Sequence, residues 1–244
     1  MERTAMAKPY VLVHGAMRGA WLWDRVVPLM EKAGAKTYAL DLPGHGARGG
    51  SRKGITTQAY ADDVARFIMD KDLRDVILVG HSMGGIIISK VAEQVPDRLA
   101  HLVYLAAAVL ADGQALIETM PPDRGELYRK AAAASPDNTI FAPFETLKTL
   151  HFTDMTDAEK DEWVRKMCPQ PFAIFSDAVD LKRFYRLNIP KTYILATQDK
   201  GLVPETCRTF AARIGCTPIE IEGGHDVMVS RPAEVAGLLL AISH

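Results

Sequence analysis

Short aliphatic runs alternate with amphipathic segments along most of the chain, and this alternation limits the fold more than any other feature. Strands are predicted at 10–13, 37–40, 76–79, 99–105, 193–196 and 218–221, and helices at 21–33, 59–69, 84–95, 204–214 and 233–242. Nearly continuous apolar strands that alternate with helices are typical of a parallel sheet covered on both faces. We therefore expect an α/β fold, with a mostly parallel sheet and helices on both faces.

The alternation stops between residues 107 and 187. This stretch has helical patterns, many Met and Phe residues, and no clear strand. An insertion between two strands of a parallel sheet lies over the carboxyl ends of the strands, where ligands bind in such folds. We therefore predict a core made of residues 1–106 and 188–244, and a helical lid, or cap, made of residues 107–187.

Aromatic and thioether side chains give the predicted lid an apolar character. We expect some of them to form the wall of an apolar pocket without a cationic clamp, and more than half of them to form the lid's own core. These residues are Met120, Phe141, Phe144, Trp163, Met167, Phe172 and Phe175.

Composition excludes several classes of function. The 244 residues are 48% hydrophobic and carry a net charge of −1, so neither nucleic acid nor a membrane surface is an expected partner. The longest apolar run, 102–111, has about half the length that a membrane span needs. The start of the chain is too short and polar for a signal peptide. Three cysteines without metal-ligand spacing, Cys168, Cys207 and Cys216, predict reduced thiols in a cytoplasmic protein.

A G-x-S-x-G pattern, Gly80-His81-Ser82-Met83-Gly84, lies between the strand at 76–79 and the helix that follows it. A serine at such a sharp strand-to-helix turn exposes its hydroxyl at the sheet edge, and glycines at both ends let the backbone segments approach. The amino terminus of the helix also favours negative charge beside the serine. Ser82 is therefore the candidate nucleophile.

A serine nucleophile of this type needs a histidine base, and such triads follow the chain order serine, acid, histidine. His225 follows a late strand in the run Glu-Gly-Gly-His and precedes the last helix, so it is the candidate base. His101 enters a strand, His151 lies in the predicted lid and His244 is terminal. We expect none of these three to be the base.

Two aspartates follow strands that end at the expected sheet edge. Asp199 comes just after the strand at 193–196, and we choose it as the acid that orients the histidine. Asp112 is the alternative, although we favour an Asp-Gly turn as the explanation of this residue. Asp226 is next to His225, and its carboxylate should point away from that ring.

The tetrahedral intermediate of ester cleavage needs two backbone N–H donors. One is expected from Met83, the residue after the serine. The other is expected from Ala16, in the loop after the first strand, where Gly15 allows close approach. His14 is expected to hold this loop by hydrogen bonds.

With these residues in place, the chain resembles the α/β-hydrolase superfamily, and within it the branch of plant methylesterases and hydroxynitrile lyases with its bacterial esterase relatives. The segments that carry the resemblance are VLVHGAMRGAWLW at 11–23, LDLPGHG at 40–46, VILVGHSMGG at 76–85, LVYLAAAVLADG at 102–113, TYILATQDK at 192–200 and IEIEGGHDVM at 219–228. The resemblance implies the α/β-hydrolase fold, a triad of Ser82, Asp199 and His225, and oxyanion donors at Ala16 and Met83.

Three positions depart from the branch. Arg18 stands where the methylesterases usually carry a histidine, and Asp226 stands where they have an apolar residue and the lyases a lysine. Gly15 stands where the lyases place a hydroxyl residue. The last two departures favour hydrolysis over hydroxynitrile cleavage.

The sequence thus predicts a serine hydrolase that cleaves a carboxylic ester of a small apolar or aromatic substrate through an acyl-enzyme on Ser82. The expected partner is this small-molecule ester, and no cofactor or metal is expected. Hydroxynitrile cleavage, other non-hydrolytic chemistry and a ligand-binding receptor on the same fold stay open as alternatives, and so does a homodimer.

Overall fold

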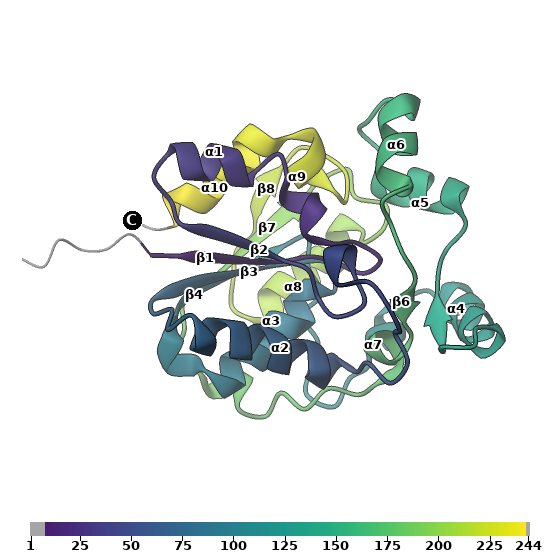
Figure 1. Ribbon diagram of the computed structural model, residues 1–244, viewed down its shortest axis with the longest axis horizontal. Coiled ribbons are helices and arrows are strands. Elements are labelled where there is room, and N and C mark those ends of the chain that lie inside the picture. The colour runs from purple at the N-terminus through teal and green to yellow at the C-terminus, as the bar shows by residue number, and fades with distance from the viewer. Residues whose placement is uncertain (1–7, 243–244) are drawn as a thin grey trace, which may run out of the picture.

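A parallel sheet forms the centre of the molecule in the computed structural model, which describes residues 8–242. Its strands follow the order β2-β1-β3-β4-β7-β8, and every neighbouring pair is parallel (Figure 1). The strands are β1 (Tyr10–Val13), β2 (Thr37–Leu40), β3 (Val76–His81), β4 (Leu99–Leu105), β7 (Lys191–Ala196) and β8 (Ile219–Ile221). This arrangement confirms the predicted fold class.

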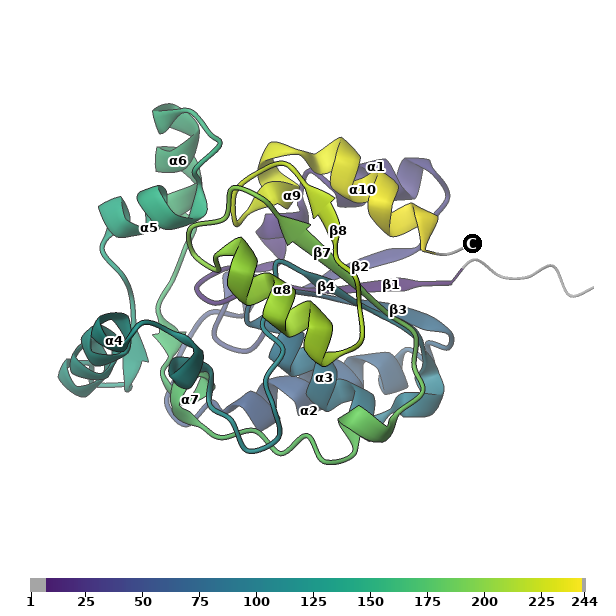
Figure 2. The same ribbon diagram turned by 180° about the vertical axis from the view of Figure 1, so that it is seen from behind.

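Helices cover both faces of the sheet. Helices α1 and α10 lie on one face and α2 and α3 on the other, as the two opposite views agree (Figures 1 and 2), and α8 packs against β7. The helices of the core are α1 (Val27–Lys32), α2 (Thr57–Asp70), α3 (Gly84–Gln94), α8 (Pro204–Arg213), α9 (Val227–Ser230) and α10 (Pro232–Ala241). The central strands β1, β3, β4 and β7 are mostly buried between these layers because their side chains are largely apolar on both faces, whereas the edge strands β2 and β8 are partly exposed.

Helix α2 illustrates how the sequence fixes a helix and its buried face. Its first turn is capped by Thr56, whose side chain accepts a hydrogen bond of 3.1 Å from the Ala59 N–H. The apolar residues Tyr60, Val64 and Ile68 recur every four positions and are buried against the core. No helix within residues 8–242 is both long and apolar enough to cross a membrane.

Several predicted helix boundaries differ from the structure by one or two residues, and one predicted helix is divided. The helix expected at 21–33 is divided into a 3-10 helix, Ala20–Trp23, and α1. A proline occupies the first turn of α1 and another the first turn of α10. Because proline has no N–H and a fixed φ, it suits the start of a helix and interrupts one that would run through it.

The segment between β4 and β7 contains short helices and, contrary to expectation, one pair of strands. Strands β5 (Thr139–Ile140) and β6 (Gln170–Pro171) pair antiparallel, and two residues are too few to show a strand periodicity in the sequence. The helices are a 3-10 helix (Leu116–Thr119), α4 (Pro122–Ala134), α5 (Phe144–His151), α6 (Asp157–Val164), α7 (Ala173–Ser176) and a second 3-10 helix (Phe184–Arg186). Helices α4, α5 and α6 lie beyond the carboxyl ends of the strands (Figure 1).

Candidate active site

The candidate nucleophile lies on a strained turn between β3 and α3. Ser82 follows the last residue of β3 and has a φ of 53°, a left-handed conformation that is unfavourable for serine. A Cβ added at Gly80 would lie 2.6 Å from the carbonyl carbon and oxygen of Gly84, so only glycine allows this turn. The turn therefore presents the serine side chain at the carboxyl edge of the sheet.

The candidate base and acid reach the same edge from the ends of β8 and β7. The Oγ of Ser82 lies 2.9 Å from Nε2 of His225, and Nδ1 of His225 lies 2.6 Å from Oδ2 of Asp199. The second carboxylate oxygen accepts hydrogen bonds from the N–H groups of Gly201 (2.7 Å) and Leu202 (2.8 Å). These donors favour an ionised carboxylate, which assigns the proton of the neutral imidazole to Nδ1 and leaves Nε2 as the acceptor.

The alternative acid is not part of this cluster. Asp112 is exposed, and its Oδ1 accepts a hydrogen bond of 2.8 Å from the Leu181 N–H. The next residue, Gly113, has a φ of 77°, which fits the Asp-Gly turn that the sequence offered as an explanation.

Two backbone donors beside the serine have no protein acceptor. Ala16 and Met83 are buried and border the same cavity as Ser82, and among the hydrogen bonds of residues 8–242 neither of their N–H groups donates to a protein atom. Buried N–H groups are almost always paired. A free pair of buried N–H groups beside a serine hydroxyl could bind an anionic oxygen.

The Ala16 amide owes its direction to His14. Nδ1–H of His14 donates to the Gly15 carbonyl (2.8 Å), and its Nε2 accepts from the Leu42 N–H (3.2 Å). Burial lowers the pKa of His14 to about 3, so the ring is neutral and can fill both roles. The Gly15 carbonyl and the Ala16 N–H belong to one trans peptide and point in opposite directions, so anchoring the carbonyl also fixes the direction of the N–H.

The approach of this loop to the serine requires a glycine. A Cβ added at Gly15 would lie 2.8 Å from the Cβ of Ser82 and 2.8 Å from Nδ1 of His81. A larger residue would push the Ala16 amide away from the serine.

A cavity of about 60 Å³ opens beside the serine and continues into a groove of about 320 Å³. Residues of both the core and the segment 107–187 border the cavity. Its apolar side chains include those of Met17, Met83, Ala108, Leu116, Met120, Phe175 and Leu202. Arg18 and Arg124 also border it, and both guanidinium groups bind protein oxygens, those of Asp226, Ala16 and Gly201.

Of the seven apolar residues singled out in the segment 107–187, two line this cavity, Met120 and Phe175. Others pack within the segment or onto the core, as expected for the larger part of the set. Trp163 stacks on Trp21 with ring centroids 5.6 Å apart, and the ring of Phe141 meets that of Phe144 edge-on.

One histidine at the cavity was not expected there. The ring of His151, at the end of α5, lies 4.8 Å from the ring of His225 in an edge-to-face arrangement, and its Nδ1 is buried without a hydrogen-bond partner. Burial, followed by the charge of Arg18, lowers the pKa of His151 well below its usual value, so this ring is neutral. No sequence pattern distinguishes it from an ordinary residue of the segment.

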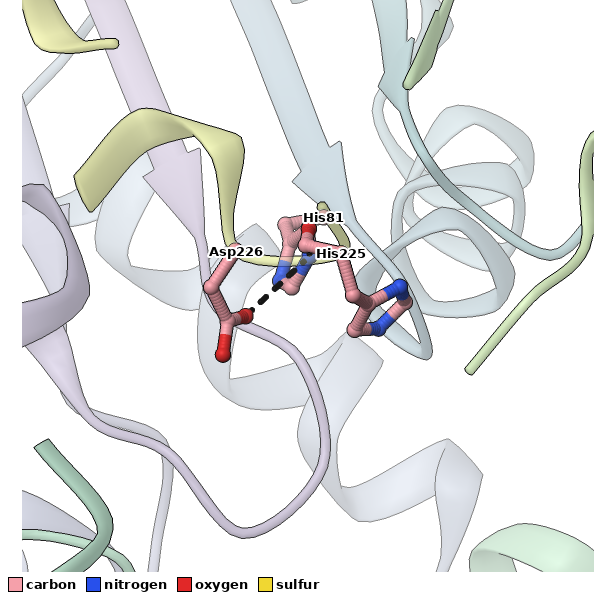
Figure 3. A group of neighbouring side chains, drawn as sticks. All are labelled: His81, His225 and Asp226. Atoms are coloured by element: carbon pink, nitrogen blue, oxygen red, sulfur yellow. Dashed lines mark hydrogen bonds and ion pairs between the residues drawn. The ribbon is translucent and has the colours of Figure 1, made fainter. Parts of the chain in front are cut away.

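Asp226 and Arg18, which both depart from the branch pattern, are partners. Nε of Arg18 lies 3.0 Å from Oδ1 of Asp226 and Nη2 lies 2.7 Å from Oδ2, a two-point ion pair with both side chains almost fully buried. As expected, the Asp226 carboxylate points away from the ring of His225 (Figure 3).

Three side chains of metal-ligand type, His81, His225 and Asp226, lie together with their ligand atoms within 4.8 Å of one another (Figure 3). Each already has another partner. Nε2 of His81 lies 3.0 Å from the carbonyl oxygen of His225, the Asp226 oxygens bind Arg18, and the His225 nitrogens face the serine and the aspartate. The donor set therefore fits a hydrogen-bonded cluster better than an ion site.

Comparison with known proteins identifies the family of the chain. The model of the alpha/beta hydrolase family matches residues 10–238, almost the whole described chain. The chain belongs to this family. The match confirms the resemblance found in the sequence and the α/β-hydrolase fold.

Named relatives of this α/β-hydrolase include esterases and a salicylic acid-binding protein. It is 31% identical to the carbendazim hydrolyzing esterase of Nocardioides sp. (strain SG-4G), across 96% of this chain and 98% of that protein. It is 29% identical to salicylic acid-binding protein 2 of Nicotiana tabacum, across 97% of each chain. A solved structure, an extracellular alpha/beta-hydrolase from a Paenibacillus species, superposes with a TM-score of 0.90 at 30% identity, covering 96% of this chain and 98% of that one.

Proposed function

We propose that this α/β-hydrolase is a serine esterase in which Ser82 attacks the carbonyl of a carboxylic ester. The observation that carries the proposal is the hydrogen-bonded chain from Ser82 through His225 to Asp199, with separations of 2.9 and 2.6 Å, beside two free amides. Nucleophile, base and oxyanion donors then border one cavity, with the orienting acid bound to the far nitrogen of the base, as acyl transfer requires. The esterases among its relatives support the same reaction.

The first half of the reaction forms an acyl-enzyme. As Oγ of Ser82 bonds to the ester carbon, its proton moves to Nε2 of His225, and the carbonyl oxygen becomes an anion held by the amides of Ala16 and Met83. The tetrahedral intermediate then collapses, and the alcohol leaves with the proton from His225.

The second half releases the acid. Water replaces the alcohol, gives a proton to His225 and attacks the acyl carbon, and a second oxyanion forms at the same two amides. Its collapse breaks the bond to Ser82, which recovers the proton, and the carboxylic acid departs. Asp199 stays ionised throughout and stabilises the imidazolium form of the histidine.

We propose that residues 107–187 form a lid that selects the substrate, while residues 1–106 and 188–244 carry the chemistry. The small cavity beside Ser82 suits a small apolar or aromatic group, and the groove that it joins suits the remainder of the ester. The two share Leu116, Met120 and Arg124 from the lid. Arg124 donates to the Gly201 carbonyl (3.0 Å), which joins the lid to the loop that bears the acid.

The proposed setting is cytoplasmic, with a small-molecule ester as the partner. Cys168, Cys207 and Cys216 are free thiols, which suits a reducing compartment. The chemistry assigned to the serine, the histidine and the amides needs no cofactor.

Covalent labelling combined with ester turnover tests the proposal. A fluorophosphonate should label Ser82, and the protein should hydrolyse p-nitrophenyl acetate, with both signals absent in Ser82→Ala. Ser89→Ala is the matched control, because Ser89 is a buried serine on α3 that binds the Gly85 carbonyl and the Tyr104 hydroxyl. Labelling of another serine would overturn the nucleophile. Release of cyanide from mandelonitrile faster than cleavage of any ester would favour the lyase alternative.

A further inference from the structure

We propose that Arg18 is a positioning residue which, through its ion pair with Asp226, holds the oxyanion loop (residues 14–18) in register with the turn that carries His225. The inference rests on the proposed esterase function and assigns a role to a pair that the triad mechanism does not use. Its basis is a set of contacts that joins the loops bearing the oxyanion donor, the base and the nucleophile.

The guanidinium of Arg18 uses three nitrogens on two partners. Nε and Nη2 hold the two carboxylate oxygens of Asp226, and Nη1 donates to the Ala16 carbonyl at 2.6 Å. The arginine is 1% exposed and the aspartate 0%. A planar fork of donors fixes direction as well as distance, which a single ammonium group cannot do.

These contacts complete the anchoring of Ala16. His14 holds the peptide before Ala16 through the Gly15 carbonyl, and Arg18 holds the peptide after it through the Ala16 carbonyl. The Ala16 residue is thus clamped on both sides. A clamp is needed here because Met17, the next residue, has a φ of 64°, a strained conformation that persists only when the surroundings hold it.

The other end of the clamp is the turn that carries the base. Asp226 directly follows His225, and its own N–H donates to the His151 carbonyl at 3.3 Å. Nε2 of His81, next to the nucleophile, donates to the His225 carbonyl at 3.0 Å and lies 3.6 Å from Oδ1 of Asp226 (Figure 3). A shift of Asp226 would therefore move the base relative to both the serine and the oxyanion donors.

The charges of His81, Arg18 and Asp226 favour a positioning role for Arg18. Burial lowers the pKa of His81 well below its usual value, and the neighbouring His225 and Arg18 add to the effect, so His81 is neutral. Arg18 is then the cation that pairs with the buried Asp226, and the pair is neutral as a whole. Removing one partner leaves a buried charge uncompensated, whereas removing both does not.

The decisive variant is therefore the double substitution Arg18→Met/Asp226→Leu, which removes both charges and keeps apolar volume. We expect kcat for p-nitrophenyl acetate to fall about 10²-fold, because small displacements of catalytic groups and a lost oxyanion contact each cost about this factor. KM should stay within about threefold, because the pair acts on the transition state and not on substrate binding. The affinity for a trifluoromethyl ketone, whose serine adduct carries an oxyanion, should fall by the same factor as kcat.

The matched control is Arg48→Met/Asp63→Leu. Arg48 also binds an aspartate at two points, with Nη2 2.9 Å from Oδ1 of Asp63, and donates to the carbonyl of Asp41 at 3.1 Å, but it is half exposed. This double variant should keep the kcat of the unchanged protein. A third variant, Arg18→Lys, keeps the positive charge but lacks the planar guanidinium. It should fold stably, and its kcat should be as low as that of Arg18→Met/Asp226→Leu.

Three results would overturn the proposal: a folded Arg18→Met/Asp226→Leu or Arg18→Lys protein with unchanged kcat, a rise in KM alone, or an equal loss of kcat in the control. If the first double variant does not fold, Arg18→Lys decides. Failure of the esterase proposal would look different, because the unchanged protein itself would then neither turn over esters nor be labelled at Ser82.

Discussion

The carboxyl edge of the sheet and the proposed lid (residues 107–187) both border the cavity, but they are built differently. In α3, which begins at the nucleophile turn, every residue from Gly84 to Ala92 is buried. In α4 of the lid, only Gly125 and Ala132 are buried. Because close packing fixes side chains in one arrangement, the sheet edge can hold atoms to the tolerance that catalysis needs. The lid, with more exposed surface, is suited to determine which ester enters.

This contrast predicts two kinds of variant. Substitutions at the sheet edge should lower kcat for every ester by a similar factor. Substitutions in the lid should alter the ranking of esters while leaving the best kcat almost unchanged.

The largest effect is expected for Ser82→Ala. Without the hydroxyl, no acyl-enzyme can form, and kcat for esters should fall roughly 10⁶-fold, as in serine hydrolases where the nucleophile is removed. Steady-state rates with acetate and phenylacetate esters of p-nitrophenol should fall together. A loss of kcat for only one of the two esters would contradict the assignment of catalysis to the sheet edge and of substrate selection to the proposed lid.

A smaller effect is expected for the acid. Asp199→Asn should lower kcat by about 10⁴-fold, because the amide favours the wrong tautomer of the histidine. Asp112→Asn is the matched control and should change the rate little, since within residues 8–242 the Asp112 carboxylate accepts a hydrogen bond only from the Leu181 N–H. The two purified variants can be compared under identical conditions, and a reversed ranking would refute the assignment.

In the lid, Phe175→Leu should change selectivity by about tenfold, the effect of a modest change in an apolar pocket. Phe175 lines the cavity and meets the ring of Tyr128 edge-on at 5.2 Å. We expect kcat/KM for the phenylacetate ester to fall relative to that for the acetate. Phe144→Leu serves as the control, because Phe144 is 48% exposed and lies outside the cavity. Equal loss for both esters with Phe175→Leu would assign the ring to stability instead.

Low pH should destabilise both the sheet edge and the proposed lid in the unsubstituted protein. Burial keeps four histidines neutral by lowering the pKa of His14, to about 3, and those of His45, His81 and His151. In the unfolded chain they titrate near pH 6.5. Below that pH the unfolded state binds more protons than the folded state. The contribution of these histidines to the free energy of unfolding is therefore fully present above about pH 6.5 and is lost progressively as pH falls towards 3.

Thermal unfolding followed by circular dichroism at pH 7.5, 6 and 5 measures this loss. His14→Gln removes one of these buried neutral histidines, in the oxyanion loop. This variant should make the midpoint of thermal unfolding less dependent on pH over this range. An unchanged midpoint of the original protein at pH 5 would contradict the burial of neutral histidines.

The residues that meet at the carboxyl edge of the sheet could be predicted from the sequence, because parallel strands all end at this edge. Once Ser82, Asp199 and His225 were placed after three strands, their proximity followed from the topology alone. The turn at Ser82 was readable for the same reason, since the glycine pattern has a local steric cause. These roles remain predictions for the variants to test.

Contacts that depend on tertiary packing could not be read. Arg18 and Asp226 are separated by 208 residues, and each was noticed only as a departure from a pattern. His151 meets His225 because α5 lies over the strand ends, and no local signal gives the position of a lid helix. Strands β5 and β6 are too short for a periodicity.

The buried pair of Arg18 and Asp226 also restricts how this site can evolve. In the hydroxynitrile lyases of the branch, a lysine follows the histidine, so the corresponding single change here is Asp226→Lys. That change would set an ammonium against the buried guanidinium of Arg18, where two like charges repel strongly and neither reaches water. A chain that evolves towards lyase chemistry would have to replace both residues together. Alternatively it could replace Arg18 first, and would then lose the clamp on the oxyanion loop. The ion pair therefore separates the two chemistries by an unstable intermediate, and an ancestor with this pair would tend to keep its hydrolytic site.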